Sequence, residues 1–164
     1  MTATHEILRV ALIGGGATLV MDVWLMILKR SGVQTLNFAF IGRWVGHLFH
    51  GRIAHAAIAK ARPIAGETLL GWLTHYAVGF AFAGLLLAIA GAPWANSPTL
   101  LPALLTGIAT VVFPLFVMQP AMGLGFAASK TPSPLKSCLR SVINHGVFGL
   151  GLFLSAWLIE WISR

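Results

Sequence analysis

Apolar residues dominate four long stretches of the chain, and charged residues collect between them. The stretches cover about residues 7–28, 69–90, 100–128 and 142–162. Each is at least as long as the roughly 20 residues that an α-helix needs to cross the hydrocarbon core of a bilayer, and the third is longer. No Asp, Glu, Lys or Arg occurs from Thr68 to Ser129, and residues 91–99, rich in Gly, Pro, Asn and Ser, separate two helices there. The pattern predicts an all-α polytopic membrane protein, a four-helix transmembrane bundle forming a single domain over residues 1–164.

The first apolar stretch resembles a targeting signal in its position only. It is long, it ends at the pair Lys29 and Arg30, and it has no clear small-residue cleavage site. We therefore expect a retained transmembrane helix.

A shorter pattern with a helical period lies in the first connection, within about residues 39–61. Arg43, His47 and His50 recur on one helical face, while apolar side chains cover the opposite face. This spacing predicts an amphipathic helix in the cytoplasmic membrane interface, with its polar face solvated among lipid headgroups. On a straight helix, His55 lies about 120–140° from that face. It can approach His47 and His50 only if Gly51 bends the chain.

Composition and charge support this assignment and orient the helices. Hydrophobic residues make up 57% of the chain and charged residues 9%, against about 25% charged in soluble domains. Of 11 Lys and Arg residues, nine lie in the first and third connections. By the positive-inside rule, these connections are expected to be cytoplasmic, with both termini on the opposite side of the membrane. The net charge of +7 then reflects topology, so we expect the lipid bilayer and no nucleic acid as partner.

Each predicted span carries one strongly polar residue at a similar depth from the cytoplasmic side: Asp22, His75, Gln119 and His145. Thr18 precedes Asp22 by one helical turn, and Asn144 adjoins His145. An ionisable side chain in hydrocarbon costs at least about 2.5–3.5 kcal/mol, so these groups should face the bundle interior or a water-filled cavity. We expect Asp22 to hydrogen-bond to His75 or His145. The six residues together form the predicted ligand- or ion-binding site in the inner leaflet.

Three functions remain open on this evidence. The polar layer binds or translocates a small solute, ion or proton; or His75 and His145 ligate haem b or a transition metal in a redox protein; or the layer is structural, in an accessory subunit. His47 and His50 are weaker metal candidates, because no carboxylate or Cys accompanies them. No cofactor is indicated firmly. With no paired carboxylates or Ser-His-Asp arrangement evident, the sequence favours a function other than catalysis. Glycines on all four spans favour close helix packing and a homo-oligomer.

Five segments resemble a family of small bacterial inner-membrane proteins, a domain of unknown function designated DUF2938. The segments are residues 16–24 (GATLVMDVW), 42–47 (GRWVGH), 71–76 (GWLTHY), 118–120 (MQP) and 144–149 (NHGVFG). The resemblance covers nearly the whole chain and implies one four-helix membrane domain. It implies no activity, cofactor or site residue.

Overall fold

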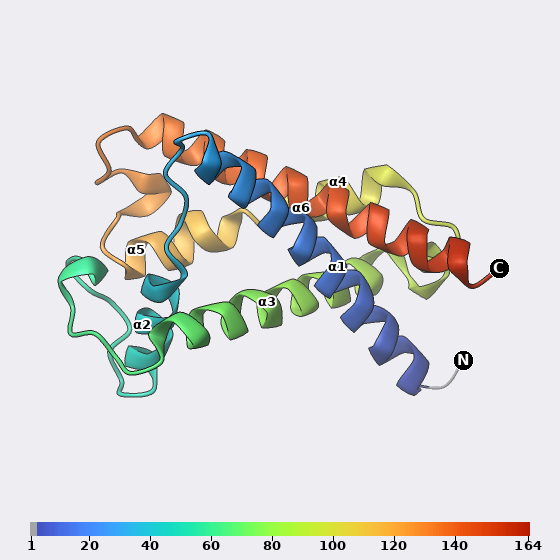
Figure 1. The fold of residues 1–164 in the computed structure, drawn as a ribbon, viewed down its shortest axis with the longest axis horizontal. Helices are drawn as coiled ribbons and strands as arrows, with labels where there is room; N and C mark the ends of the chain where they lie inside the picture. The colour runs from blue at the N-terminus through green and yellow to red at the C-terminus, as the bar shows by residue number, and fades with distance from the viewer. Residues whose placement is uncertain (1–2) are drawn as a thin grey trace. The chain divides into compact units, whose positions relative to one another are not determined.

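The computed structural model describes residues 3–164, and within this range it is helical with no β-strand (Figure 1). Four helical segments are long and apolar enough to cross a membrane. Three of them are α1 (Ala3–Arg30), α3 (Glu67–Ala90) and α6 (Pro134–Ile162). The fourth, Leu100–Ala121, combines α4 (Leu100–Ala109), a π-helix (Pro114–Met118) and α5 (Gln119–Ala121). The chain is thus the all-α membrane protein that the apolar pattern predicts.

Two boundaries differ from those expected. The third span ends at Ala121 rather than near residue 128, because Gly123 has a φ of +89° and turns the chain. Pro114 and Pro120, which remove backbone donors, coincide with the π-helix and with α5. At the other end, α6 begins at Pro134, before the predicted start near residue 142. Its first turns contain Lys136 and Arg140, which are good helix formers but interrupt an apolar run.

The residues cluster into two compact units. The first comprises the chain up to Gln34, Tyr76–Thr110 and Ile143–Arg164; the second comprises Thr35–His75 and Val111–Val142. Both α3 and α6 contribute residues to each unit.

The first unit is built on close crossings between glycine-bearing helices. A Cβ on Gly107 of α4 would lie 2.5 Å from Gly149 Cα of α6, and one on Gly14 of α1 would lie 2.8 Å from Phe80 Cα of α3. Gly151 of α6 packs equally closely on Ala17 of α1. These glycines therefore serve packing within one copy of the chain, where small residues let backbones approach. They no longer argue for a homo-oligomer, which stays a prediction.

The second unit contains the short helix α2 (Phe38–Leu48), whose N-terminus is capped by Asn37. The Asn37 side chain accepts a hydrogen bond from the backbone N–H of Ala39 (3.0 Å). Glycines again permit backbone contact, since Gly42 of α2 lies against the Glu67 carbonyl and Gly71 of α3 lies against the Phe38 carbonyl. Helix α2 thus packs directly on the first turns of α3.

Candidate functional site

A carboxylate and a phenol meet within the first unit. The Tyr76 hydroxyl, from α3, donates a hydrogen bond to Asp22 Oδ2 of α1 at 2.9 Å, and both residues are half-buried. One turn before Asp22, the fully buried Thr18 donates to the Gly14 carbonyl (2.8 Å) and contacts Gly79 of α3. The Asp22–Tyr76 pair therefore lies one helical turn from a tight α1–α3 crossing, which fixes the two backbones that carry it.

A second polar pair has a comparable position on α4 and α6. The Thr110 hydroxyl donates to the Gly107 carbonyl (2.6 Å), and His145 Nδ1 lies 2.9 Å from the same hydroxyl oxygen. Because the one hydroxyl proton is already donated, His145 must donate from Nδ1. In a neutral imidazole this leaves Nε2 as the nitrogen with a lone pair. Gly107 and Gly149 form the close crossing one turn away.

The remaining predicted residues have separate environments. The Trp24 indole donates to Asn144 Oδ1 (3.0 Å), which joins α1 to α6. His75 and Gln119 belong to the second unit. The His75 ring lies beside Phe38, with centroids 4.7 Å apart. Gln119 is 9% exposed, and no described residue hydrogen-bonds to its Oε1.

Within the first unit, the structure brings Asp22 next to Thr18 along α1 and gives it a partner that the sequence interpretation missed. That partner is Tyr76, whose hydroxyl donates to the Asp22 carboxylate; the expected hydrogen bond from Asp22 to His75 or His145 stays a prediction. Tyr76 is the only tyrosine of the chain, and this could have drawn attention to it, since a tyrosine in an apolar helix carries a hydroxyl that needs a partner. The six-residue site as a whole stays a prediction.

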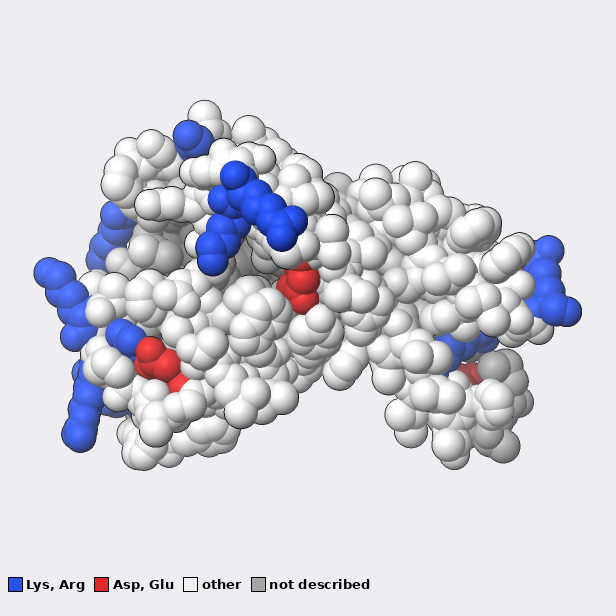
Figure 2. Space-filling model, in the orientation of Figure 1, with Lys and Arg blue, Asp and Glu red and all other residues white. Residues whose placement is uncertain are grey.

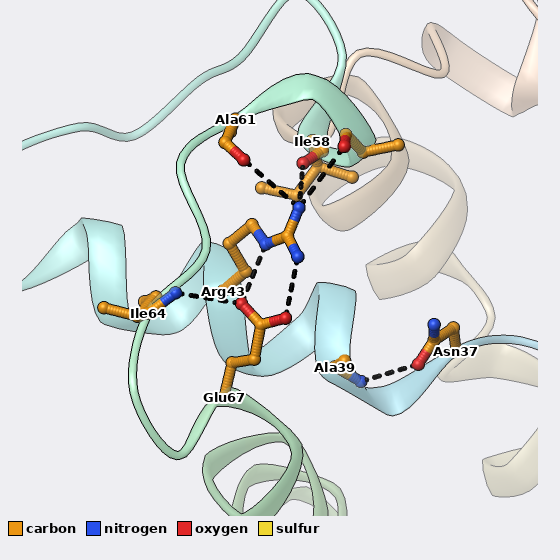
Figure 3. A network of polar contacts seen from close by, with 8 residues as sticks. Asn37, Ala39, Arg43, Ile58, Ala61, Ile64 and Glu67 are labelled. Carbon is orange, nitrogen blue, oxygen red and sulfur yellow. Dashed lines mark hydrogen bonds and ion pairs between the residues drawn. The ribbon is translucent and has the colours of Figure 1, made fainter.

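In the second unit, Arg43 makes a buried ion pair with Glu67 (Figure 3). Its Nε and Nη2 donate to the two carboxylate oxygens at 2.8 and 2.7 Å. Its Nη1 donates to three carbonyls, those of Ile58, Ala59 and Ala61, at 3.2–3.3 Å. The hydrogen bonds to Glu67 raise the pKa of Arg43 further above its usual range. One guanidinium thus connects α2, the segment after it and the start of α3.

This pair corrects the expected orientation of α2. Arg43 is 7% exposed and His47 is 8% exposed, so the predicted solvated polar face is wrong for both residues. Arg43 faces the protein because Glu67, far along the sequence, supplies the counter-charge. His47 faces it beside the ring of His55. Only His50 of the three is exposed, and its ring contacts the Gly46 carbonyl at 2.9 Å.

His47 meets His55 rather than His50. Gly51 adopts a φ of +73°, the left-handed conformation that glycine accepts readily, and the chain folds back. His47 Nδ1 and His55 Nε2 then lie 2.7 Å apart, in stacked rings that are both buried. Burial lowers the pKa of His55, and electrostatic interactions with His47 and Arg52 lower it further.

This environment predicts loss of stability on acidification. Folded His55 resists protonation, whereas the unfolded chain takes up a proton near the ordinary pKa of about 6.5. The stabilisation is therefore complete above about pH 6.5 and decreases as the pH falls toward the lowered pKa. We expect the melting temperature of the wild type to fall more steeply with acid than that of His55→Gln. The exposed His5→Gln serves as control and should follow the wild type; parallel curves for wild type and His55→Gln would refute the prediction.

The geometry adds no support for metal binding by the predicted histidines. Among residues 3–164, no group of three or more His, Cys, Asp or Glu side chains is arranged to hold a metal ion. Haem or metal ligation by His75 and His145 stays a prediction, as does the weaker pair His47 and His50.

The fold and these polar pairs define a helical membrane protein in which polar side chains hydrogen-bond between helices. The chain belongs to the DUF2938 family, described as proteins of unknown function, whose model matches residues 11–159. No curated protein and no solved structure matches it.

Proposed function

We propose that this protein binds a small cation or a proton within the membrane, at the Asp22–Tyr76 pair, and takes part in its translocation. The observation that supports this is the 2.9 Å hydrogen bond from Tyr76 to a carboxylate on a membrane-spanning helix. An acidic side chain within a membrane-spanning helix has a high free-energy cost and usually marks an ion or proton pathway.

The chemistry of the pair suits this role. A carboxylate provides two acceptor oxygens, and the phenol donates its proton to one of them, Oδ2. Oxygen ligands of this kind suit hard cations. Because the pair lies beside the tight Gly14–Gly79 crossing, its geometry is set by backbone packing rather than by flexible side chains.

The proposal includes a location. We infer a bacterial inner membrane, with nine of 11 Lys and Arg residues on the cytoplasmic side and both termini in the periplasm. This orientation opens the site toward the cytoplasm. Reporter fusions after Ala92 and after Arg62 read the two sides directly, and a cytoplasmic signal after Ala92 would reverse the assignment.

The binding function is tested by cation-dependent stability of the purified full-length protein. The melting temperature in sodium or potassium chloride should differ from that in choline chloride at equal ionic strength. For a proton site, it should change with pH instead. We expect Asp22→Asn to abolish that shift while preserving the fold, because asparagine keeps the shape and loses the charge. Tyr76→Phe should weaken the shift, since it removes one hydrogen bond, which contributes about 1.5–3 kcal/mol when a charged group takes part.

The matched control is Glu6→Gln, which removes an exposed acid from the same helix. It should leave the shift unchanged. If no cation and no pH change separates Asp22→Asn from the wild type, the pair is structural and the proposed function fails.

A further inference from the structure

The segment that follows α2 displays apolar side chains on the outside of the second unit. Phe49 is 80% exposed and Ile53 is 68% exposed. They do not belong to a loose loop, since the Trp44 indole donates to the Ile53 carbonyl at 2.9 Å and Arg43 binds three carbonyls further on. The segment is therefore held with its apolar residues facing outward.

The same segment carries three exposed cations: Arg52, Lys60 and Arg62. Seven Lys or Arg residues fall in the second unit, against one acidic residue, Glu67. Glu67 is already neutralised by its ion pair with Arg43. Figure 2 shows Lys and Arg side chains on the surface of the part that Figure 1 draws as α2 and the segment after it. The exposed charge of this segment is thus positive and has no acidic counterpart within it.

The position of the segment along the chain indicates what covers it. Arg62 lies only a few residues before Glu67, where a membrane-spanning helix begins, and the preceding span ends at Arg30. Both ends of the connection are therefore at a membrane surface. Phenylalanine and isoleucine there can enter the acyl-chain boundary, while Arg and Lys reach the phosphates.

We propose that residues 49–62 form a docking surface for anionic phospholipid. Phe49 and Ile53 insert between the lipid chains, and Arg52, Lys60 and Arg62 bind the headgroup phosphate and its uncompensated negative charge. The buried contacts of Arg43 and His47 position this surface before lipid arrives, so little ordering is required on binding. The surface is independent of Asp22 and of the proposed ion site.

The test compares the full-length protein in nanodiscs of phosphatidylcholine alone and in nanodiscs that also contain phosphatidylglycerol. We expect phosphatidylglycerol to raise the wild-type melting temperature. The triple variant Arg52→Gln/Lys60→Gln/Arg62→Gln should lose more than half of that increase, and Phe49→Ser/Ile53→Ser should also reduce it. In phosphatidylcholine alone, all of these proteins should melt alike, because the substituted side chains are exposed.

The control variant Lys130→Gln/Lys136→Gln removes two exposed cations of the same unit but outside the segment. It should retain most of the increase. The proposal is overturned if the triple variant keeps the full increase, if the control loses as much as the triple variant, or if phosphatidylglycerol has no effect on the wild type. An equal increase with inorganic phosphate would also overturn it, since that outcome identifies a site for free anions.

Discussion

Replacing Arg43 by methionine should destabilise the second unit by about 3 kcal/mol, since removal of one partner leaves a poorly solvated charge uncompensated. The Glu67 carboxylate, whose side chain is 16% exposed, would lose two charge-assisted hydrogen bonds. Three carbonyls of the segment after α2 would lose their donor as well. The measurement is the free energy of unfolding in mixed micelles, or the melting temperature where unfolding is irreversible.

Two further variants separate the buried charge from the loss of the side chain. Adding Glu67→Gln to Arg43→Met should recover part of the stability, because the uncompensated charge is gone. Arg164→Met is the matched control, since Arg164 also makes a 2.7 Å ion pair, with Glu160, but is 73% exposed. It should melt like the wild type. Equal behaviour of Arg43→Met and Arg164→Met would show that burial of the ion pair contributes nothing.

The second large effect is expected at Gly149, where α6 crosses α4. A Cβ there would lie 2.9 Å from both the Ala103 carbonyl oxygen and Leu104 Cα, which are backbone atoms and cannot rotate away. Gly149→Ala should therefore separate the helices and cost about 1–3 kcal/mol, the usual range for overpacking. The same displacement should weaken the hydrogen bond between Thr110 and His145.

Gly146 provides a control one turn earlier on the same helix. A Cβ there meets nothing within 4 Å, so Gly146→Ala should stabilise the protein by about 0.5–1 kcal/mol through helix propensity alone. Melting temperatures of the two variants should move in opposite directions. A stabilising Gly149→Ala would mean that α4 and α6 do not pack as described.

The apolar pattern predicts the spans well because length and hydropathy are set by the bilayer rather than by tertiary contacts. The same pattern identifies Asp22, because an acidic residue within an apolar span is unusual. It does not identify Tyr76, because a tyrosine in an apolar helix is also typical of the membrane interface, and the pairing depends on how α1 and α3 are rotated where they cross.

The orientation of α2 could not be derived from its own sequence. Periodicity shows that Arg43 and His47 share a face, but not whether that face is solvated or buried. Glu67 decides this, together with the bend at Gly51 that brings His55 to His47. Both contacts join α2 to residues outside it, so the periodicity of α2 alone does not show them. The positive φ angles of Ala127 and Ala128 likewise have no signal in the local sequence.

The most direct test of an ion or proton site at Asp22 uses the one tyrosine of the chain as a reporter. Because Tyr76 is unique, ring-labelled tyrosine gives a single Cζ resonance in nuclear magnetic resonance spectra of the protein in nanodiscs. A hydrogen bond to a carboxylate changes when that carboxylate is protonated or binds a cation, so the resonance should move on acidification or on addition of sodium or potassium. In Asp22→Asn it should stay fixed under the same conditions. A wild-type resonance that does not move, or one that moves equally in Asp22→Asn, would contradict the proposed site.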